Sequence, residues 1–93
     1  MYYARDLQTA ERVLAELRNT RLDDKAATLA CLHRIRNEVA CERAGDHARL
    51  QAWMSIRKLY DAFKAAPDRD LKPLWHAAIS HTAAWSESLR GAS

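Results

Sequence analysis

The sequence is poor in the residues that interrupt helices and in those that favour strands. Its 93 residues include two glycines and two prolines, too few for the turns of a sheet-rich fold, for collagen or for a flexible linker. Two valines, three isoleucines and four threonines leave little β-branched surface for strands. Alanine, arginine and leucine instead fill 18, 11 and 11 positions, and all three favour helix. The composition predicts an all-α protein whose residues 1–93 form one domain.

Long apolar runs and disulfide pairs are missing as well. The sequence contains no run of about 18 apolar residues, the length that a helix needs to cross a bilayer. Its first residues also lack a secretory signal pattern. Cys31 and Cys41 lie ten positions apart on one predicted helix, a rise of about 15 Å. That separation excludes a disulfide between them. These absences predict a cytoplasmic protein with reduced, structural cysteines.

Turn and capping residues divide the chain into four segments. Asp23 or Asp24, Asp46 and Asp70 are placed to cap helices, and Gly45 is placed to end one. Short turns between long helices make sequence neighbours antiparallel neighbours. The pattern predicts a compact antiparallel four-helix bundle, with an intertwined helical homodimer as the alternative. The predicted helices span residues 5–18, 24–43, 47–65 and 71–90.

Arginines lie close to the apolar faces of the second and third predicted helices. Arg36 and Arg43 follow the edge of one apolar arc, and Arg57 lies inside the other, with Asp61 one turn later. That second arc covers more than half of its helix and includes Met54. The arginines either rest their stems on the core edge and pair with carboxylates, or converge to bind a phosphate or an acidic patch of a partner.

The last predicted helix has no formal charge between Pro73 and Ser86. Its core face is apolar, and its other face is small and neutral. In a chain with 29% charged residues, such a face indicates close packing on a second side, by other helices, a partner or a second copy. The partner-binding residues predicted from both patterns are Arg36, Arg43, Arg57, His76, Ser80, His81 and Ala84.

The histidines and cysteines do not have the spacing of a metal site, and no cofactor motif is present. His76 and His81 are five positions apart, not the four of a helical zinc pair. His76, Ser80 and Glu87 share one row, but Glu87 lies about 16 Å along the helix from His76. A hydrogen-bonded relay needs contact distances of about 3 Å. We therefore expect no catalytic site, metal or cofactor from these residues.

One short segment has a likeness to a known family. The pattern Arg69-Asp70-x5-His76, over eight residues, resembles the Arg-polar-x-His pattern of the HEPN ribonuclease superfamily. In that family the arginine and histidine act on the 2′-hydroxyl and phosphate of RNA. The resemblance implies the same roles for Arg69 and His76 in an HEPN-like ribonuclease.

These patterns together predict a small non-catalytic helical protein that binds another macromolecule, foremost a protein, as an inhibitor, adaptor or regulator. The arginine and alanine content fits a bacterium with a GC-rich genome, or a phage or mobile element. Self-association as a homodimer through the third or fourth helix is a further expectation. The alternative is a nucleic-acid-binding regulator, since phosphate binding requires cationic surface. Its basic residues, on the second and third helices, would be Arg36, Arg43, Arg49, Arg57 and Lys58.

Overall fold

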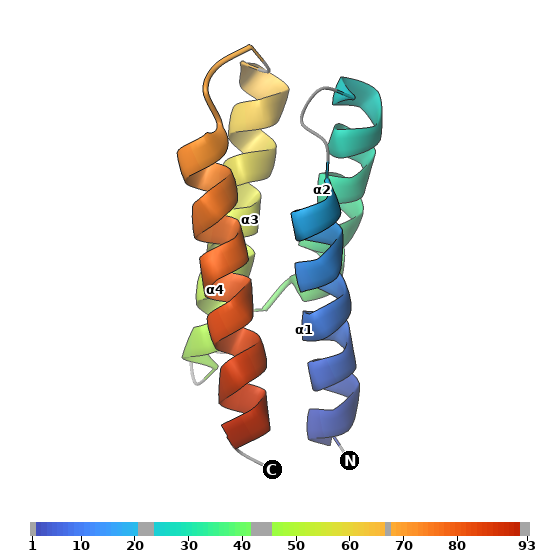
Figure 1. Ribbon diagram of the computed structural model, residues 1–93, viewed down its shortest axis with the longest axis vertical. Coiled ribbons are helices and arrows are strands. Elements are labelled where there is room, and N and C mark those ends of the chain that lie inside the picture. The colour runs from blue at the N-terminus through green and yellow to red at the C-terminus, as the bar shows by residue number, and fades with distance from the viewer. Residues whose placement is uncertain (1, 21–23, 42–45, 67, 92–93) are drawn as a thin grey trace.

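Four antiparallel α-helices pack side by side as a bundle, with α3 and α4 on one side and α1 and α2 on the other (Figure 1). The computed structural model describes residues 2–20, 24–41, 46–66 and 68–91, and in these ranges the secondary structure is helical with no strand. The prediction of an all-α four-helix bundle is confirmed. None of the described helices is long and apolar enough to cross a membrane. The helices are α1 (Tyr2–Asn19), α2 (Lys25–Val39), α3 (His47–Ala65) and α4 (Lys72–Gly91).

Aspartates begin three of the helices, as their positions in the sequence predict. The carboxylates of Asp24 and Asp46 accept hydrogen bonds from the backbone N–H three residues later, at 3.2 and 3.3 Å. Asp70 accepts one from the N–H of Lys72 at 3.1 Å. Each bond satisfies a donor that has no partner within its helix. The bounds of α3 are those predicted, whereas α1 begins three residues earlier, and Gly45 lies outside the described residues.

The prediction for the end of α2 is wrong, because this helix ends at Val39 and not at residue 43. Arg49 of α3 donates hydrogen bonds to the carbonyl oxygens of Glu38, Val39 and Ala40, at 3.3, 3.1 and 3.4 Å. The guanidinium satisfies acceptors that would otherwise need another helical turn. Cys41 consequently lies beyond the helix, and Cys31 and Cys41 are not joined by a disulfide.

One face of each helix contributes to the core. α4 packs along both α1 and α3, α2 packs on α3, and α1 lies diagonally opposite α3. Close to the end of α1, the indole Nε1 of Trp75 donates a hydrogen bond to the carbonyl oxygen of Leu17 at 2.8 Å. The largest fully buried side chains are Trp85, Leu17, Leu32, Ile35, Ile56, Leu59, Val13, Val39 and Thr82.

Arg49 contacts all four helices. Besides its three bonds to the end of α2, its guanidinium lies 3.8 Å from a carboxylate oxygen of Asp6 in α1. The same group lies 5.4 Å from the centroid of a Trp85 ring in α4. The guanidinium presents five N–H donors in one plane, which is why one side chain can serve acceptors on several elements.

We expect Arg49→Ala to lower the free energy of unfolding by about 2–3 kcal/mol, because it leaves several acceptors without their charged donor. Arg49→Lys should recover less than half of this loss, since an ammonium lacks the planar fork. Urea unfolding followed by circular dichroism measures both changes. Arg18→Ala, at an exposed position of α1, is the control and should shift stability by less than about 0.5 kcal/mol. Equal stability of Arg49→Ala and Arg18→Ala would contradict the role of Arg49.

Candidate interaction surfaces

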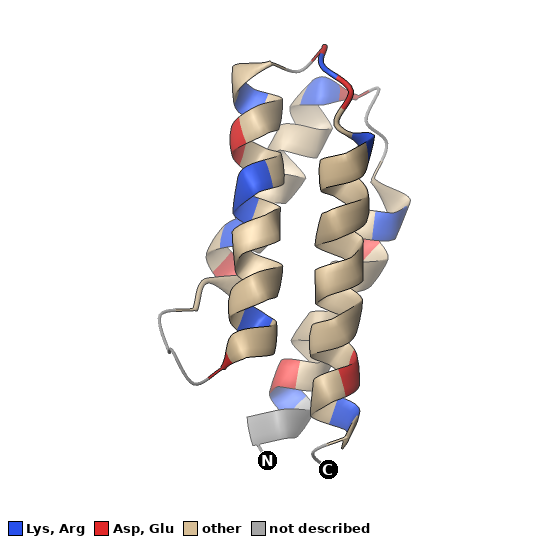
Figure 2. Ribbon diagram, turned by 90° about the vertical axis from the view of Figure 1, so that its left-hand side faces the viewer, with Lys and Arg blue, Asp and Glu red and all other residues tan. Residues whose placement is uncertain are grey.

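The outer face of α4 is open to solvent and uncharged. His76, Ser80 and Ala84 are exposed, while Ala77 and His81 are half-buried. Figure 2 shows α4 without a charged residue between Lys72 and Glu87, beside an α3 that carries several. The other face of α4 packs on α1 and α3. Packing within this chain therefore accounts for the core face of α4 and leaves its neutral face uncovered.

A groove runs between the outer sides of α3 and α4. Its volume is about 160 Å³, and Met54, which is 45% exposed, lies at its α3 side. Met54 lies on the wide apolar arc of α3 and is exposed because that arc extends beyond the surface that α2 and α4 cover. The groove residues are Gln51, Met54, Ser55, Lys58, Leu74, Ala77 and His81.

Two of the predicted arginines lie where α2 and α3 meet, on the other side of α3 from the groove. Arg36 belongs to α2 and Arg57 to α3. The guanidinium carbon of Arg36 lies 4.7 Å from the ring centroid of Tyr60, and that of Arg57 lies 4.9 Å from a ring centroid of Trp53. Neither forms an ion pair with a carboxylate of the described residues. The pair between Arg57 and Asp61 that their spacing favours is therefore not formed. Arg43 lies outside the described residues.

The remaining residues of the predicted basic surface lie elsewhere. Arg49 is engaged with the end of α2 and with Asp6, so its charge serves the fold. Lys58 lines the groove between α3 and α4. Lys64, which the sequence patterns did not single out, instead joins the α2 side, where its ammonium lies 6.0 Å from the ring centroid of Tyr60. Lys64 is seven residues from Arg57, and residues at that spacing lie on the same side of a helix. This spacing could have predicted that both cations lie on one side of α3.

Charged pairs bridge α1 and α2, the most widely separated neighbouring helices. Arg12 of α1 donates to both carboxylate oxygens of Glu38 in α2. In the other direction, Arg34 of α2 donates to Glu16 of α1 at 2.7 Å. Hydrogen bonds to these carboxylates raise the pKa of both guanidinium groups. The charges on this side of the bundle therefore neutralise one another.

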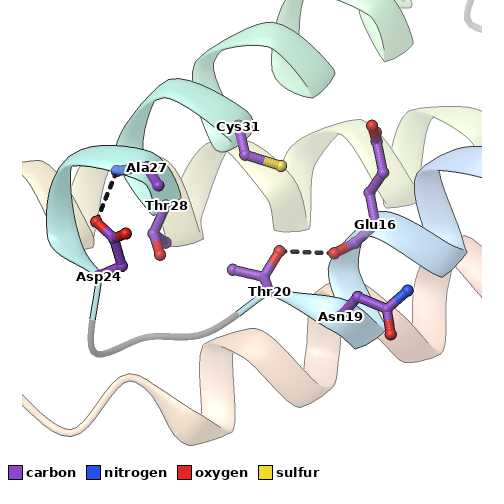
Figure 3. Close-up of a pocket in the computed structure, with 7 residues that line it drawn as sticks. All are labelled: Glu16, Asn19, Thr20, Asp24, Ala27, Thr28 and Cys31. Atoms are coloured by element: carbon purple, nitrogen blue, oxygen red, sulfur yellow. Dashed lines mark hydrogen bonds between the residues drawn. The ribbon is translucent and has the colours of Figure 1, made fainter.

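A cavity of about 400 Å³ opens between the last turn of α1 and the first turns of α2 (Figure 3). Its carboxylates are already in use. Glu16 is paired with Arg34, and Asp24 accepts the N–H of Ala27. The Thr20 hydroxyl donates to the Glu16 carbonyl oxygen at 2.6 Å. Asp24 and Thr20 thus hold the helix ends in place. The second carboxylate oxygen of Glu16, Oε2, is buried without a hydrogen-bond partner and lies 3.5 Å from Nη1 of Arg12.

The residues considered for catalysis lie at the surface. His76 and Ser80 are exposed on α4, and the His76 ring lies 5.5 Å from a ring of the neighbouring Trp75. Arg69, in the segment before α4, is exposed and has no bond to His76. In the part of the chain that the structure describes, no three His, Cys, Asp or Glu side chains gather closely enough to hold a metal ion.

Comparisons of the chain with protein-family models, with curated proteins and with solved structures gave no significant match.

One exposed ion pair joins the beginning of α2 to the segment that precedes α4. The ammonium of Lys25 donates to the carboxylate of Asp68 at 2.6 Å. This hydrogen bond, and the charge of Lys25, hold the pKa of the Asp68 carboxyl below its ordinary value. A carboxyl whose pKa is lowered by folding stabilises the folded state above its unfolded pKa. That contribution is lost as the pH falls through the lowered value.

We expect Lys25→Met to raise the pKa of Asp68 toward the ordinary value of an exposed aspartate, because the variant removes the hydrogen bond and charge that lower it. Titration of the carboxyl carbon by NMR measures the shift. The matched control, Lys72→Met, removes another exposed lysine and should leave this pKa unchanged. High salt should move the pKa of Asp68 in the same direction as Lys25→Met, because the pair is exposed and screened. An unchanged pKa in Lys25→Met would exclude the pair in solution.

Proposed function

We infer that the protein is a non-catalytic binding module, an inhibitor, adaptor or regulator, that holds a partner protein against its α3–α4 face. We define this face as Met54 of α3 with His76, Ser80, His81 and Ala84 of α4. The observation that carries the proposal is the uncharged outer side of α4, which is exposed although 29% of the chain is charged.

The chemistry of the α3–α4 face supports a protein partner. The centres of protein interfaces contain few charged residues and are enriched in methionine and aromatic side chains. Met54 is the large apolar side chain that is exposed among the described residues, and its flexible thioether adapts to the shape of a partner. The small side chains of Ala84 and Ser80 allow a partner backbone to come close.

The groove beside Met54 has a suitable size for one partner side chain. Its volume is about 160 Å³, comparable to cavities of roughly 150 Å³ that admit benzene. An aromatic or branched aliphatic side chain of the partner would fill it and bury Ala77 and Leu74, which line it. Such an anchor in a pocket, surrounded by weaker contacts, is how protein interfaces concentrate their binding energy.

A second copy of this chain satisfies the same requirements. Across a two-fold axis residue i contacts residue j and j contacts i, and only residues at the axis meet their own copy. A charged residue near the axis would therefore lie opposite the same charge. The segment Pro73–Ser86 avoids this repulsion, because it contains no Asp, Glu, Lys or Arg. The neutral face is therefore compatible with self-association, and the experiment below separates a homodimer from a different partner.

A carboxylate on the α3–α4 face should weaken capture of the partner. We expect Ala84→Glu and Met54→Glu to weaken partner binding at least about tenfold, because each places a carboxylate where the partner would exclude water. The tagged protein is incubated with host lysate, with and without nuclease, at two salt concentrations. Binding that survives nuclease and salt indicates contact with a protein. Light scattering of the purified variants measures self-association.

The matched control is Ala30→Glu, which adds the same charge to an exposed position of α2. It should capture the same protein as the unmodified chain. If the unmodified chain dimerises and the α3–α4 variants do not, the partner is a second copy. A monomer that captures no protein, or capture unaffected by Ala84→Glu and Met54→Glu, would refute the proposal.

A further inference from the structure

The side of α3 that faces α2 carries positive charge with little to neutralise it. Arg36, Arg57 and Lys64 form no ion pair with a carboxylate of the described residues, and Asp61 is the carboxylate nearest to them in α3. This differs from the α1–α2 side, where the arginines are paired with glutamates. Other described cations without an ion pair lie singly, such as Arg18 on α1 and Lys58 in the α3–α4 groove. Arg36, Arg57 and Lys64 instead lie along one face, which we call the α2–α3 face.

One stripe of α3 and one neighbour from α2 build this face. Trp53, Arg57, Tyr60 and Lys64 follow each other at intervals of four, three and four residues, so they lie in a row along the helix. Arg36 reaches the row from α2 by stacking on Tyr60. The cations at Arg57 and Lys64 are separated by seven residues, about 10 Å along the helix.

The aromatic rings prepare the two guanidinium groups for a ligand. A guanidinium that stacks on a ring uses its flat face, and its N–H donors point outward in the plane. Arg36 and Arg57, at 4.7 and 4.9 Å from their rings, therefore have a defined position and free donors. Planar donors of this kind match the two oxygens of a phosphate or a carboxylate.

We propose that the α2–α3 face binds the sugar-phosphate backbone of nucleic acid without regard to base sequence. The exposed apolar side chain that a protein partner would require, Met54, belongs to the groove on the other side of α3. Contacts on the α2–α3 face are therefore ionic. Tyr60 is only 8% exposed and Trp53 is half-buried, and a guanidinium covers each ring. The rings accordingly support the arginines and are not platforms for bases.

Ionic contact with phosphates makes affinity depend on salt in a known way. Neutralisation of three phosphates of a duplex gives a slope of about −2.7 for the logarithm of affinity against the logarithm of salt concentration. We therefore expect affinity for a short mixed-sequence DNA duplex to fall about 40-fold between roughly 50 and 200 mM salt. Fluorescence anisotropy with labelled duplexes of two unrelated sequences measures the slope and should give the same affinity for both.

The variant Arg36→Gln with Arg57→Gln removes two cations from the face, so the slope should fall to about −0.9. The matched control is Arg5→Gln with Arg18→Gln, at exposed positions of α1, the helix opposite α3. The control has the same net charge and should keep the slope of the unmodified chain. Lys64→Gln is a milder test, because it removes one cation from the face and preserves both arginines that lie over rings. Circular dichroism establishes that each variant is folded.

Several results would overturn the proposal. The first is the absence of salt-dependent binding to DNA or RNA. The second is a fall of the salt slope in the α1 control as large as that in the Arg36→Gln, Arg57→Gln variant. The third is tighter binding of polyglutamate than of the duplex. The last result would assign the face to an acidic protein. Ala84→Glu, on the other surface, should leave the slope unchanged, so this face and the α3–α4 face can fail separately.

Discussion

The guanidinium of Arg49 is the contact on which the arrangement of this bundle depends. It closes the end of α2, reaches Asp6 of α1 and lies over Trp85 of α4 from its position at the start of α3. Apolar packing alone tolerates sliding of one helix along another, whereas hydrogen bonds to particular carbonyl groups define one position. At the opposite end, the bond from Trp75 to the Leu17 carbonyl similarly fixes α4 against α1. The bundle is thus aligned at both ends by directional bonds, with apolar contacts between them.

Alignment of the helices places two chemically different surfaces on the two sides of α3. Toward α4 the surface has Met54, Lys58 and the neutral side of α4, and toward α2 it has cations that lie over aromatic rings. The remaining sides differ from both, because the charges between α1 and α2 are paired. The modest net charge of +3 thus conceals an uneven distribution, which supports two separate binding roles for one small helical domain.

The sequence was sufficient for the features that arise within one helix. Asp24, Asp46 and Asp70 act on the first turns that follow them, so spacing alone located the starts of three helices. Features that join different helices were not accessible. The end of α2 depends on Arg49, whose side chain comes back across a turn, and the exposure of Met54 depends on how much of α3 its neighbours cover. A helical wheel gives the direction of each side chain around its own helix. It does not show where the neighbouring helices lie, so it cannot tell which apolar side chains they cover.

The caps supplied by other helices also determine how the chain folds. The final carbonyl groups of α1 and α2 are satisfied by Trp75, 58 residues from Leu17, and by Arg49, ten residues from Val39. A fragment that contained only α1 and α2 would leave these acceptors and two apolar faces in water, and isolated helices of this length are marginal. We therefore expect that neither half of the chain folds alone and that the chain unfolds in a single cooperative transition. Both surfaces share α3, and they are therefore formed together and lost together.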